Sequence, residues 1–215
     1  MIVPLPTARL PGQDTLTKYY DHNKIWSRRL DHNHPVWGSY SVILYKRILS
    51  LLDQHDIKAG RMIDYGSGAG KFGELAEAAG FKYTGIDDSN AAIILGKKNW
   101  PGLDLLEWDL ASKELPMPYQ LFADIGTAIN SLHCLTEPGH RQQFLDNMSL
   151  GIKSGGYLFI STMVGPLTKE YRPSENPRLY LEPDEVSPRG PISSIAYVSL
   201  SNSRMKSTSA SLLVL

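Results

Sequence analysis

The sequence predicts an α/β protein in which helices cover both faces of a doubly wound, mostly parallel β-sheet, giving three layers in the order α/β/α. Two observations support this prediction. Short apolar runs of strand length alternate with segments of helical periodicity between residues 61 and 163, and glycine or aspartate follows the first three runs. Such alternation makes βαβ units, whose right-handed crossovers bring the loops after the strands to one edge of the sheet, where ligands bind.

The elements before residue 110 follow from apolar spacing and from residues that begin or end helices. Apolar residues at helical spacing predict a helix over 36–52, and short apolar runs predict strands over 61–65, 83–86 and 103–108. A helix over 72–79 ends at Gly80. A second helix over 90–99 begins after Ser89, which suits the N-cap position, and ends before Pro101.

After residue 110 the alternation of strand and helix patterns continues, and in the last fifty residues these patterns become weaker. Strands are expected over 121–129 and 157–163, with a helix over 139–152 and a tight turn at Ser154-Gly155-Gly156 between them. Six of the 14 prolines lie between residues 166 and 191, and nine serines follow between 187 and 211. Two weak strand patterns, over 192–200 and 210–215, could form an antiparallel hairpin at the sheet edge or a poorly ordered tail.

These patterns divide the chain into three parts. Residues 1–38 form an irregular or helical segment that could close over the site as a lid, residues 39–165 form the α/β core, and residues 166–215 form the proline- and serine-rich segment with the potential edge hairpin. A chain of 215 residues is long enough for one domain with a substantial core.

Composition and charge exclude several kinds of partner. Lysine plus arginine and aspartate plus glutamate both number 22, and no basic run exceeds two residues, which argues against a nucleic acid partner. Cys134 is the only cysteine, so neither an intrachain disulfide nor a cysteine-based metal site is expected, and we predict no metal. Because no apolar run is long enough to span a bilayer and the N-terminus lacks a secretory pattern, we expect no membrane partner and a cytoplasmic location.

A glycine-rich loop follows the first expected strand. Residues 64–73, DYGSGAGKFG, hold four glycines, and they partly fit three ligand-binding patterns. A phosphate-binding P-loop is set aside, because Tyr65 stands where its first glycine belongs and Phe72 where its hydroxyl residue belongs. A dinucleotide pattern can begin at Gly68, with Asp87 nineteen residues later as the ribose-binding acid.

The third pattern, Asp64-x-Gly66-x-Gly68-x-Gly70, places its first glycine directly after the strand, where the backbone must turn. In this pattern the chain resembles the class I S-adenosylmethionine-dependent methyltransferases over roughly residues 40–165. The resemblance rests on five stretches in order, which are MIDYGSGAGKFGELAEAAG, YTGIDDSNAAI, LLEWDL, LFADIGTAINSLHCL and IKSGGYLFIST. It implies a Rossmann-like fold and S-adenosyl-L-methionine as the cofactor.

The resemblance also implies roles for particular residues, and the chemistry of those residues fits them. The glycines let the backbone approach the cofactor, and the helix that follows presents its positive end to the methionine carboxylate. Asp87 can accept hydrogen bonds from both ribose hydroxyls. Asp109 can accept from the adenine amine, and Asp64 orients the loop or the cofactor's amino group. The full set of expected cofactor-binding residues is Asp64, Gly66, Ser67, Gly68, Gly70, Asp87, Asp88, Trp108, Asp109, Asn130 and Tyr20.

Several of these residues have an alternative structural role. Asp64 could stabilise a turn, Asp87 and Asp88 could be acids at a helix N-terminus, and Asp109 could lie in a surface turn. The candidate catalytic bases are His133, after the fourth strand, and His34, in the N-terminal segment. His133 could equally be a half-buried packing residue.

The expected acceptor is a small molecule, methylated on oxygen, nitrogen or carbon by in-line displacement. Residues 130–133, Asn-Ser-Leu-His, lack the Asn/Asp-Pro-Pro-Tyr/Phe signature of nucleic acid and glutamine N-methyltransferases, and Cys134 lacks the preceding proline of the cytosine-C5 enzymes. The alternative hypothesis is a nucleotide-binding Rossmann-like protein without methyl transfer, either a degenerate methyltransferase module or an NAD-binding protein. The altered C-terminal segment makes this alternative relevant, since that region normally supplies part of the family's substrate wall.

Overall fold

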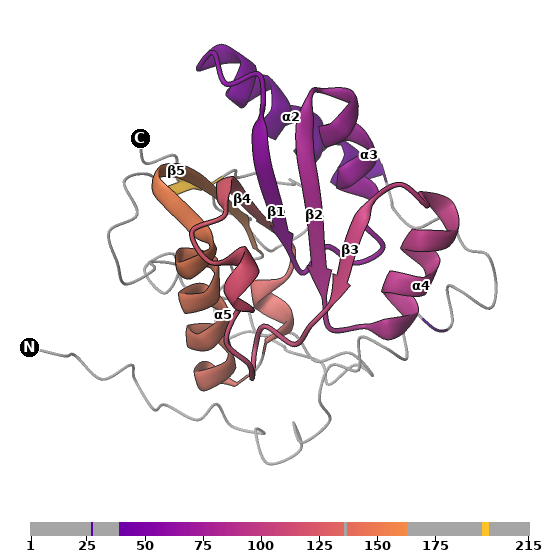
Figure 1. Cartoon of the computed structure of the whole chain (residues 1–215), viewed down its shortest axis with the longest axis vertical. Coiled ribbons are helices and arrows are strands. Elements are labelled where there is room, and N and C mark those ends of the chain that lie inside the picture. Colours follow the sequence, from indigo (N-terminus) through magenta and orange to yellow (C-terminus); the bar gives the residue numbers. More distant parts are fainter. Residues whose placement is uncertain (1–26, 28–38, 136, 163–194, 198–215) are drawn as a thin grey trace, which may run out of the picture.

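A computed structural model describes Ser27 and residues 39–135, 137–162 and 195–197. Its sheet has six strands, and every neighbouring pair is parallel in the order β3-β2-β1-β4-β5-β6 (Figure 1). The strands are β1 (Gly60–Tyr65), β2 (Phe81–Asp87), β3 (Asp104–Glu107), β4 (Ala123–Ile129), β5 (Ile152–Ser161) and β6 (Ile195–Tyr197). Strand order reverses between β1 and β4, which is the switch point where ligands bind in such sheets.

Helices lie on both faces of this sheet, so the predicted three layers are confirmed (Figure 1). The α-helices are α2 (Ser39–Gln54), α3 (Lys71–Ala78), α4 (Asn90–Asn99) and α5 (Pro138–Gly151), with short 3-10 turns η2 (Met117–Tyr119) and η3 (Leu132–Cys134). The predicted bounds of α4 are confirmed, and the Ser89 hydroxyl caps this helix by accepting from the Ala92 amide at 3.2 Å.

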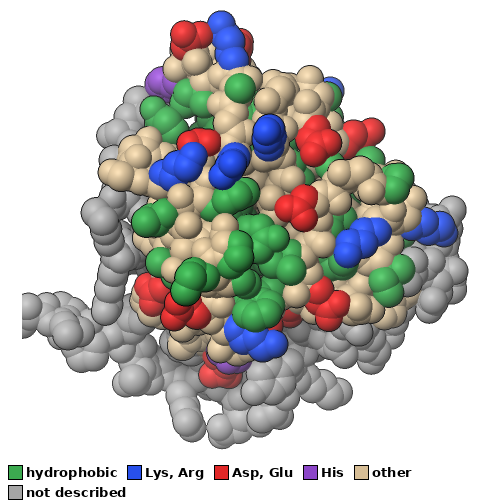
Figure 2. All heavy atoms as spheres, viewed as in Figure 1, with side chains coloured by type: hydrophobic (Ala, Val, Ile, Leu, Met, Phe, Trp, Pro, Cys, Tyr) green, Lys and Arg blue, Asp and Glu red, His purple; other side chains and the backbone are tan. Residues whose placement is uncertain are grey.

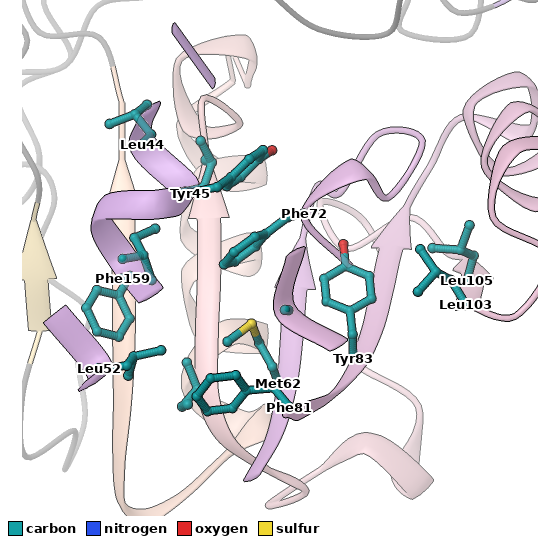
Figure 3. Packing of buried hydrophobic residues seen from close by; sticks show 14 of the residues in the cluster. Leu44, Tyr45, Leu52, Met62, Phe72, Phe81, Tyr83, Leu103, Leu105 and Phe159 are labelled. Atoms are coloured by element: carbon teal, nitrogen blue, oxygen red, sulfur yellow. The ribbon is translucent and has the colours of Figure 1, made fainter. Parts of the chain in front are cut away.

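Alternation of side chains along β1 builds a separate core on each face. Met62 packs with α2 and α3, where the Tyr45 and Phe72 rings stack at 4.4 Å between centroids (Figure 3). Its neighbour Ile63 packs on the other face with Phe144 of α5. Because β1 is buried on both faces, it reads as a continuous apolar run rather than an alternating one, as parallel strands do.

The surface on the α5 side carries no large area of one charge sign. Figure 2 shows this face, where basic and acidic side chains are interspersed and apolar side chains gather near the middle. Met117 and Leu121 are among the exposed apolar residues of the described part of the chain. This mixed pattern on the face in view agrees with the balanced charge of the sequence.

The last strand of the core, β5, differs from the expectation at its start. The predicted tight turn at Ser154–Gly156 lies inside β5, and the strand starts at Ile152 rather than Tyr157. The prediction of a break was wrong, but Gly155 has a φ of 80° and the pairing register with β4 shifts between Ala123 and Ile125. The glycine pair therefore forms an irregularity within one strand, since glycine inside a strand often marks a bulge.

Of the two strands expected in the C-terminal segment, only part of the first lies within the described residues. β6 falls within the first of the two weak strand patterns and pairs in parallel with β5, at Leu158, Phe159 and Ile160. The second strand of the expected hairpin, over 210–215, lies outside the described residues, as does the expected lid over 1–38 apart from Ser27.

Asn147 of α5 holds the loop that follows β3. Its buried side-chain amide donates to the carbonyl oxygens of Leu110 and Lys113 at 2.7 and 2.8 Å, and its Oδ1 accepts from the Leu115 amide at 2.7 Å. The loop carries Trp108 and Asp109 at its start, so one side chain of α5 sets the shape of the segment next to the carboxyl edge of β3.

Replacing Asn147 with alanine is expected to lower the free energy of unfolding by about 2–4 kcal/mol, because it leaves three backbone groups without their partner, two of them in buried hydrogen bonds. Urea denaturation followed by circular dichroism measures the change. Gln142→Ala on the same helix is the control, since it removes only a surface hydrogen bond to Asp146 and should cost about 0.5 kcal/mol or less. Equal effects of the two substitutions would contradict the role given to Asn147.

Candidate functional site

The glycine-rich loop turns sharply at the end of β1 and is fastened to β2. Gly66, Gly68 and Gly70 have φ angles of 73°, 56° and 75°, all in the left-handed region that favours glycine. The amides of Gly66 and Ser67 both donate to the carbonyl oxygen of Ile86, at 2.8 and 3.0 Å. The turn therefore begins at Gly66, as the third sequence pattern predicts.

Close neighbours also restrict two of these positions to glycine. A Cβ atom at Gly66 would collide with the Ser131 side chain, which enters from the loop after β4. A Cβ atom at Gly70 would lie 2.7 Å from Cδ2 of Leu105. The loop is thus packed against Leu105 of β3 and Ser131 of the loop after β4, and a side chain at either glycine would meet both this crowding and the strain of a left-handed backbone.

Asp87 ends β2 and connects the glycine loop to the start of α4. One carboxylate oxygen accepts from the Gly68 amide at 2.7 Å, and the other accepts from the Ser89 amide at 3.0 Å. A carboxylate has about four acceptor positions, and each amide uses one, so holding the loop is compatible with binding a ribose diol. The neighbouring Asp88 is exposed, so the two predicted acids occupy different environments.

Asp64 lies beneath the loop, and its side chain is almost fully buried at 1% exposure. Its two carboxylate oxygens accept from the hydroxyls of Tyr83 and Thr127, at 2.8 and 2.7 Å. The pKa of Asp64 is raised to about 7, chiefly by burial and to a smaller extent by the negative charge of Asp87, while the hydrogen bonds from Thr127 and Tyr83 act in the opposite direction. This geometry favours a role in orienting the loop.

The start of α3 fits the carboxylate of an amino acid. Gly70 occupies the N-cap position and provides no side-chain hydrogen bond to the first turn of the helix. The positive end of the helix dipole therefore faces the loop without a capping side chain. Together, the left-handed glycine backbone, this helix start and the Asp87 carboxylate fit a cofactor that carries both a carboxylate and a ribose diol.

The predicted adenine-binding residues follow β3. The Asp109 carboxylate accepts from the amides of Ala111 and Ser112 at 2.9 and 3.2 Å, and also from the Ser112 hydroxyl. It therefore closes the turn after the strand, which is the structural alternative that the sequence left open. The half-buried Trp108 donates from its indole nitrogen to the Glu114 carbonyl at 3.0 Å. Contact of Trp108 and Asp109 with adenine stays a prediction.

The loop after β4 brings Asn130, Ser131 and His133 to the same edge of the sheet. Asn130 has a φ of 59°, and its amide donates to the Ser161 carbonyl at 2.7 Å. His133 lies in η3 with 1% exposure, and its Nδ1 is 3.4 Å from the Thr162 hydroxyl. The structure thus gives His133 a buried hydrogen-bonded position, and its action as a base stays a prediction.

Two predicted residues cannot be placed, because Tyr20 and His34 lie outside the described residues. Within the described ranges, no group of three or more potential metal ligands occurs together. No helix in those same ranges is both long and apolar enough to cross a membrane.

Sequence reasoning missed Tyr83, Thr127 and Ser131 as parts of the site. Tyr83 and Thr127 lie inside apolar strand segments, where a hydroxyl residue looks like ordinary packing. One signal was present, since a buried carboxylate at Asp64 requires hydrogen-bond donors from neighbouring strands. Thr127 is the register partner of Asp64 on β4, and that register cannot be obtained from the sequence.

Comparisons with known proteins agree with this geometry. Residues 63–160 match the family model described as a methyltransferase domain. No curated protein matches the sequence.

Among solved structures, the chain is similar to N-methyltransferase NodS from Bradyrhizobium japonicum WM9, with bound S-adenosyl-L-homocysteine. That match has 20% identity and a TM-score of 0.54, and it covers 67% of this chain and 74% of NodS. The match to SAM-bound CalS10, an amino pentose methyltransferase from Micromonospora echinaspora, has 19% identity and a TM-score of 0.51 over 62% of this chain and 60% of CalS10. DesVI from Streptomyces venezuelae matches with 15% identity and a TM-score of 0.51, over 59% of this chain.

The chain spans about half to two thirds of the length of the first matched structures, with 52% of DesVI and 60% of CalS10 covered. At these identities the structural matches establish the fold alone, and the family model covers residues 63–160, a little less than half of the chain. The loop, Asp87 and the helix start that fit an amino acid carboxylate and a ribose all lie within the matched residues. Residues 63–160 of the chain therefore match a methyltransferase domain, and the chain shares the fold of two methyltransferases whose structures hold S-adenosylmethionine or S-adenosyl-L-homocysteine.

Proposed function

We propose that this protein is an S-adenosyl-L-methionine-dependent methyltransferase that moves a methyl group to an oxygen, nitrogen or carbon atom of a small molecule. The observation that carries the proposal is the glycine loop, which begins at Gly66 and is held by the Asp87 carboxylate through the Gly68 amide. Asp87 would bind the cofactor's ribose and the α3 N-terminus its carboxylate. The sulfonium of the bound cofactor supplies an already activated methyl group.

The protein's own contribution to such a reaction is chiefly positioning. The methyl group needs a nucleophile held in line with the sulfur–carbon bond, and orientation of the two reactants can account for much of the acceleration. The loop after β4, residues 130–135, lies against the glycine loop through the contact between Ser131 and Gly66. We place the acceptor next to this loop.

A small-molecule acceptor is supported by two features of the chain. The loop after β4 lacks the proline-containing signature of nucleic acid and glutamine N-methyltransferases, and formal net charge is zero. NodS is an N-methyltransferase and CalS10 an amino pentose methyltransferase, so proteins of this fold include ones that act on nitrogen and on a small sugar.

The proposal is tested with cofactor labelled at the methyl group and a cell extract separated by ultrafiltration into small molecules and macromolecules. Transfer of label to the small-molecule fraction, with release of S-adenosylhomocysteine, is the expected result. Label that enters only protein or nucleic acid would overturn the small-molecule assignment, and binding of cofactor without any transfer would favour the degenerate module.

The candidate base His133 has its own test. Under the proposal, His133→Ala lowers kcat by about 100-fold or more, as loss of a general base does, while the Kd for S-adenosylhomocysteine changes by less than about threefold. Steady-state kinetics with the identified acceptor and calorimetry measure the two quantities. Cys134→Ala, in the same buried turn, is the matched control. If both variants lose the same activity, His133 is a packing residue bonded to Thr162.

A further inference from the structure

Pairing between β1 and β4 ends before either strand does. The two strands are neighbours in the sheet (Figure 1), and their last register pair is Asp64↔Thr127. β1 continues to Tyr65 and β4 to Ile129, so the carboxyl ends of the two strands are no longer paired with each other. The glycine loop and the loop after β4, residues 130–135, both begin here. A fixed distance between these loops must therefore come from contacts beyond the sheet.

Ser131 makes a contact of this kind. Its hydroxyl oxygen lies 3.3 Å from the carbonyl oxygens of Tyr65 and Gly66, and 3.4 Å from the carbonyl oxygen of Ile129. The hydroxyl has one proton for three acceptors, and all three distances exceed the usual O–H···O distance of about 2.7–2.8 Å. The hydrogen bond that joins the two loops is therefore shared among the acceptors and long.

Packing against Gly66 sets the closest approach of the two loops. A Cβ atom at Gly66 would lie 2.8 Å from the Cβ atom of Ser131 and would also collide with its hydroxyl oxygen. The glycine thus brings the backbone of the glycine loop directly against this side chain. Ser131 restricts the spacing of the loops in both directions, by packing when they approach and by its hydrogen bond when they separate.

The backbone after β4 departs from ordinary local preferences where it places this hydroxyl. Ser131 is the N-cap residue of η3, where a serine side chain normally accepts from an amide of the first turn, but it makes no such bond. Its φ of −100° and ψ of −45° are helical, whereas an N-cap residue is usually extended. The preceding Asn130 has a left-handed φ of 59°, which is uncommon for a residue with a side chain. Such departures gather at functional sites, and here they accompany a hydroxyl that contacts the glycine loop instead of capping its own helix.

We propose that Ser131 is a positioning residue that fixes the loop after β4 relative to the glycine loop, and thereby sets the distance between the acceptor and the methyl group. The inference rests on the proposed function, which places the cofactor on the glycine loop and the acceptor beside the loop after β4. Ser131 acts through these two loops and not by contact with the reacting atoms.

Methyl transfer is sensitive to this distance. The acceptor's lone pair forms the new bond to the methyl carbon while the sulfur–carbon bond breaks and its electron pair returns to sulfur. Any proton on the acceptor atom leaves to a base or to solvent. An error of about 1 Å in the alignment of two reactants can lower a rate by about 100-fold. A residue that holds the two loops together should therefore affect the rate of transfer more than the binding of cofactor.

The experiment compares Ser131→Ala with the unaltered protein, with thermal unfolding as the test of folding. Calorimetric titration with S-adenosylhomocysteine gives the Kd. Methyl-labelled S-adenosylmethionine, with increasing amounts of the small-molecule fraction of a cell extract, gives the maximal rate of label transfer. We expect this rate to fall about tenfold or more, because the loops are no longer held together. The Kd should change by less than about threefold, because only one long hydrogen bond is lost.

Cys134→Ala is the matched control. The Cys134 thiol lies 3.6 Å from the Asn130 carbonyl oxygen, within the loop after β4, so this substitution alters that loop and leaves its link to the glycine loop in place. The Kd and the maximal rate should both stay within about threefold of the unaltered protein. Equal losses of rate in the two variants would overturn the proposal, since any damage to the loop would then explain the effect.

Two further results would overturn the proposal. One is an unchanged maximal rate in Ser131→Ala, and the other is a Kd that rises as much as the rate falls, because Ser131 would then act in cofactor binding. If the unaltered protein transfers no label, the proposed function fails, and this inference fails with it. If Ser131→Ala does not fold, hydrogen exchange of the unaltered protein decides. Saturating S-adenosylhomocysteine must slow exchange of the Cys134 amide, which bonds to the Ser131 carbonyl at 3.0 Å, and an unchanged exchange rate would overturn the proposal.

Discussion

Replacing Asp87 with alanine is expected to weaken binding of S-adenosylhomocysteine by about 100-fold or more. The substitution removes an ionised acceptor for the two ribose hydroxyls, and hydrogen bonds to charged groups are worth about 1.5–3 kcal/mol each. It also releases the Gly68 amide, which Asp87 holds at 2.7 Å, so the loop loses its connection to β2 at this point. Calorimetric titration gives the change in Kd.

The matched control for this substitution is Asp104→Ala. Asp104 is the first residue of β3, at the amino end of that strand, and it accepts a hydrogen bond from the Thr84 hydroxyl at 2.9 Å. Its loss removes one carboxylate and one hydrogen bond without touching the loop, so Kd should stay within about threefold. An unchanged Kd in Asp87→Ala, or an equal loss in the two variants, would refute the assignment of the ribose-binding acid.

Asp64 is expected to make the stability of the protein fall as the pH rises towards neutrality. Its pKa is raised from 3.8 to about 7 in the folded protein, chiefly by burial. As the pH rises between these two values, the unfolded chain loses this proton and the folded chain keeps it, so unfolding becomes more favourable. The contribution is fully present below about pH 4 and is lost by about pH 7, a change of about 4 kcal/mol from this one group.

The measurement is urea denaturation between about pH 5 and about pH 8 for the unaltered protein and Asp64→Asn. The unaltered protein should lose about 2–3 kcal/mol more than the variant over this range, because asparagine cannot ionise. Asp56→Asn provides the surface control, since Asp56 is 86% exposed in its ion pair with Lys58. Parallel stability curves for the unaltered protein and Asp64→Asn would show that the buried carboxyl has an ordinary pKa.

The parts of the fold that depend on local pattern could be predicted from the sequence. Alternating strand and helix patterns gave the parallel sheet, and the N-cap chemistry of Ser89 gave the start of α4. The start of the ligand loop at Gly66 was also predictable, because the backbone must turn where a buried strand ends and only glycine tolerates the left-handed conformation there.

The parts that depend on register and burial could not be predicted. The sequence does not show that Tyr83 and Thr127 lie beside Asp64, because their position depends on how β1 pairs with β2 and β4. The burial of His133 depends on the path of the loop after β4, and the closing of a local turn by Asp109 competes with its predicted adenine contact. In each case the spacing of residues in the sequence allowed the polar side chain more than one local hydrogen-bond partner.

The most direct test of the central claim is a calorimetric titration of the purified protein with S-adenosylhomocysteine and, in parallel, with NAD. The loop that begins at Gly66, the helix start at Gly70 and the Asp87 carboxylate predict micromolar binding of S-adenosylhomocysteine and no binding of NAD. Binding of NAD alone would contradict the account, because it would make Gly68 the first glycine of a dinucleotide site.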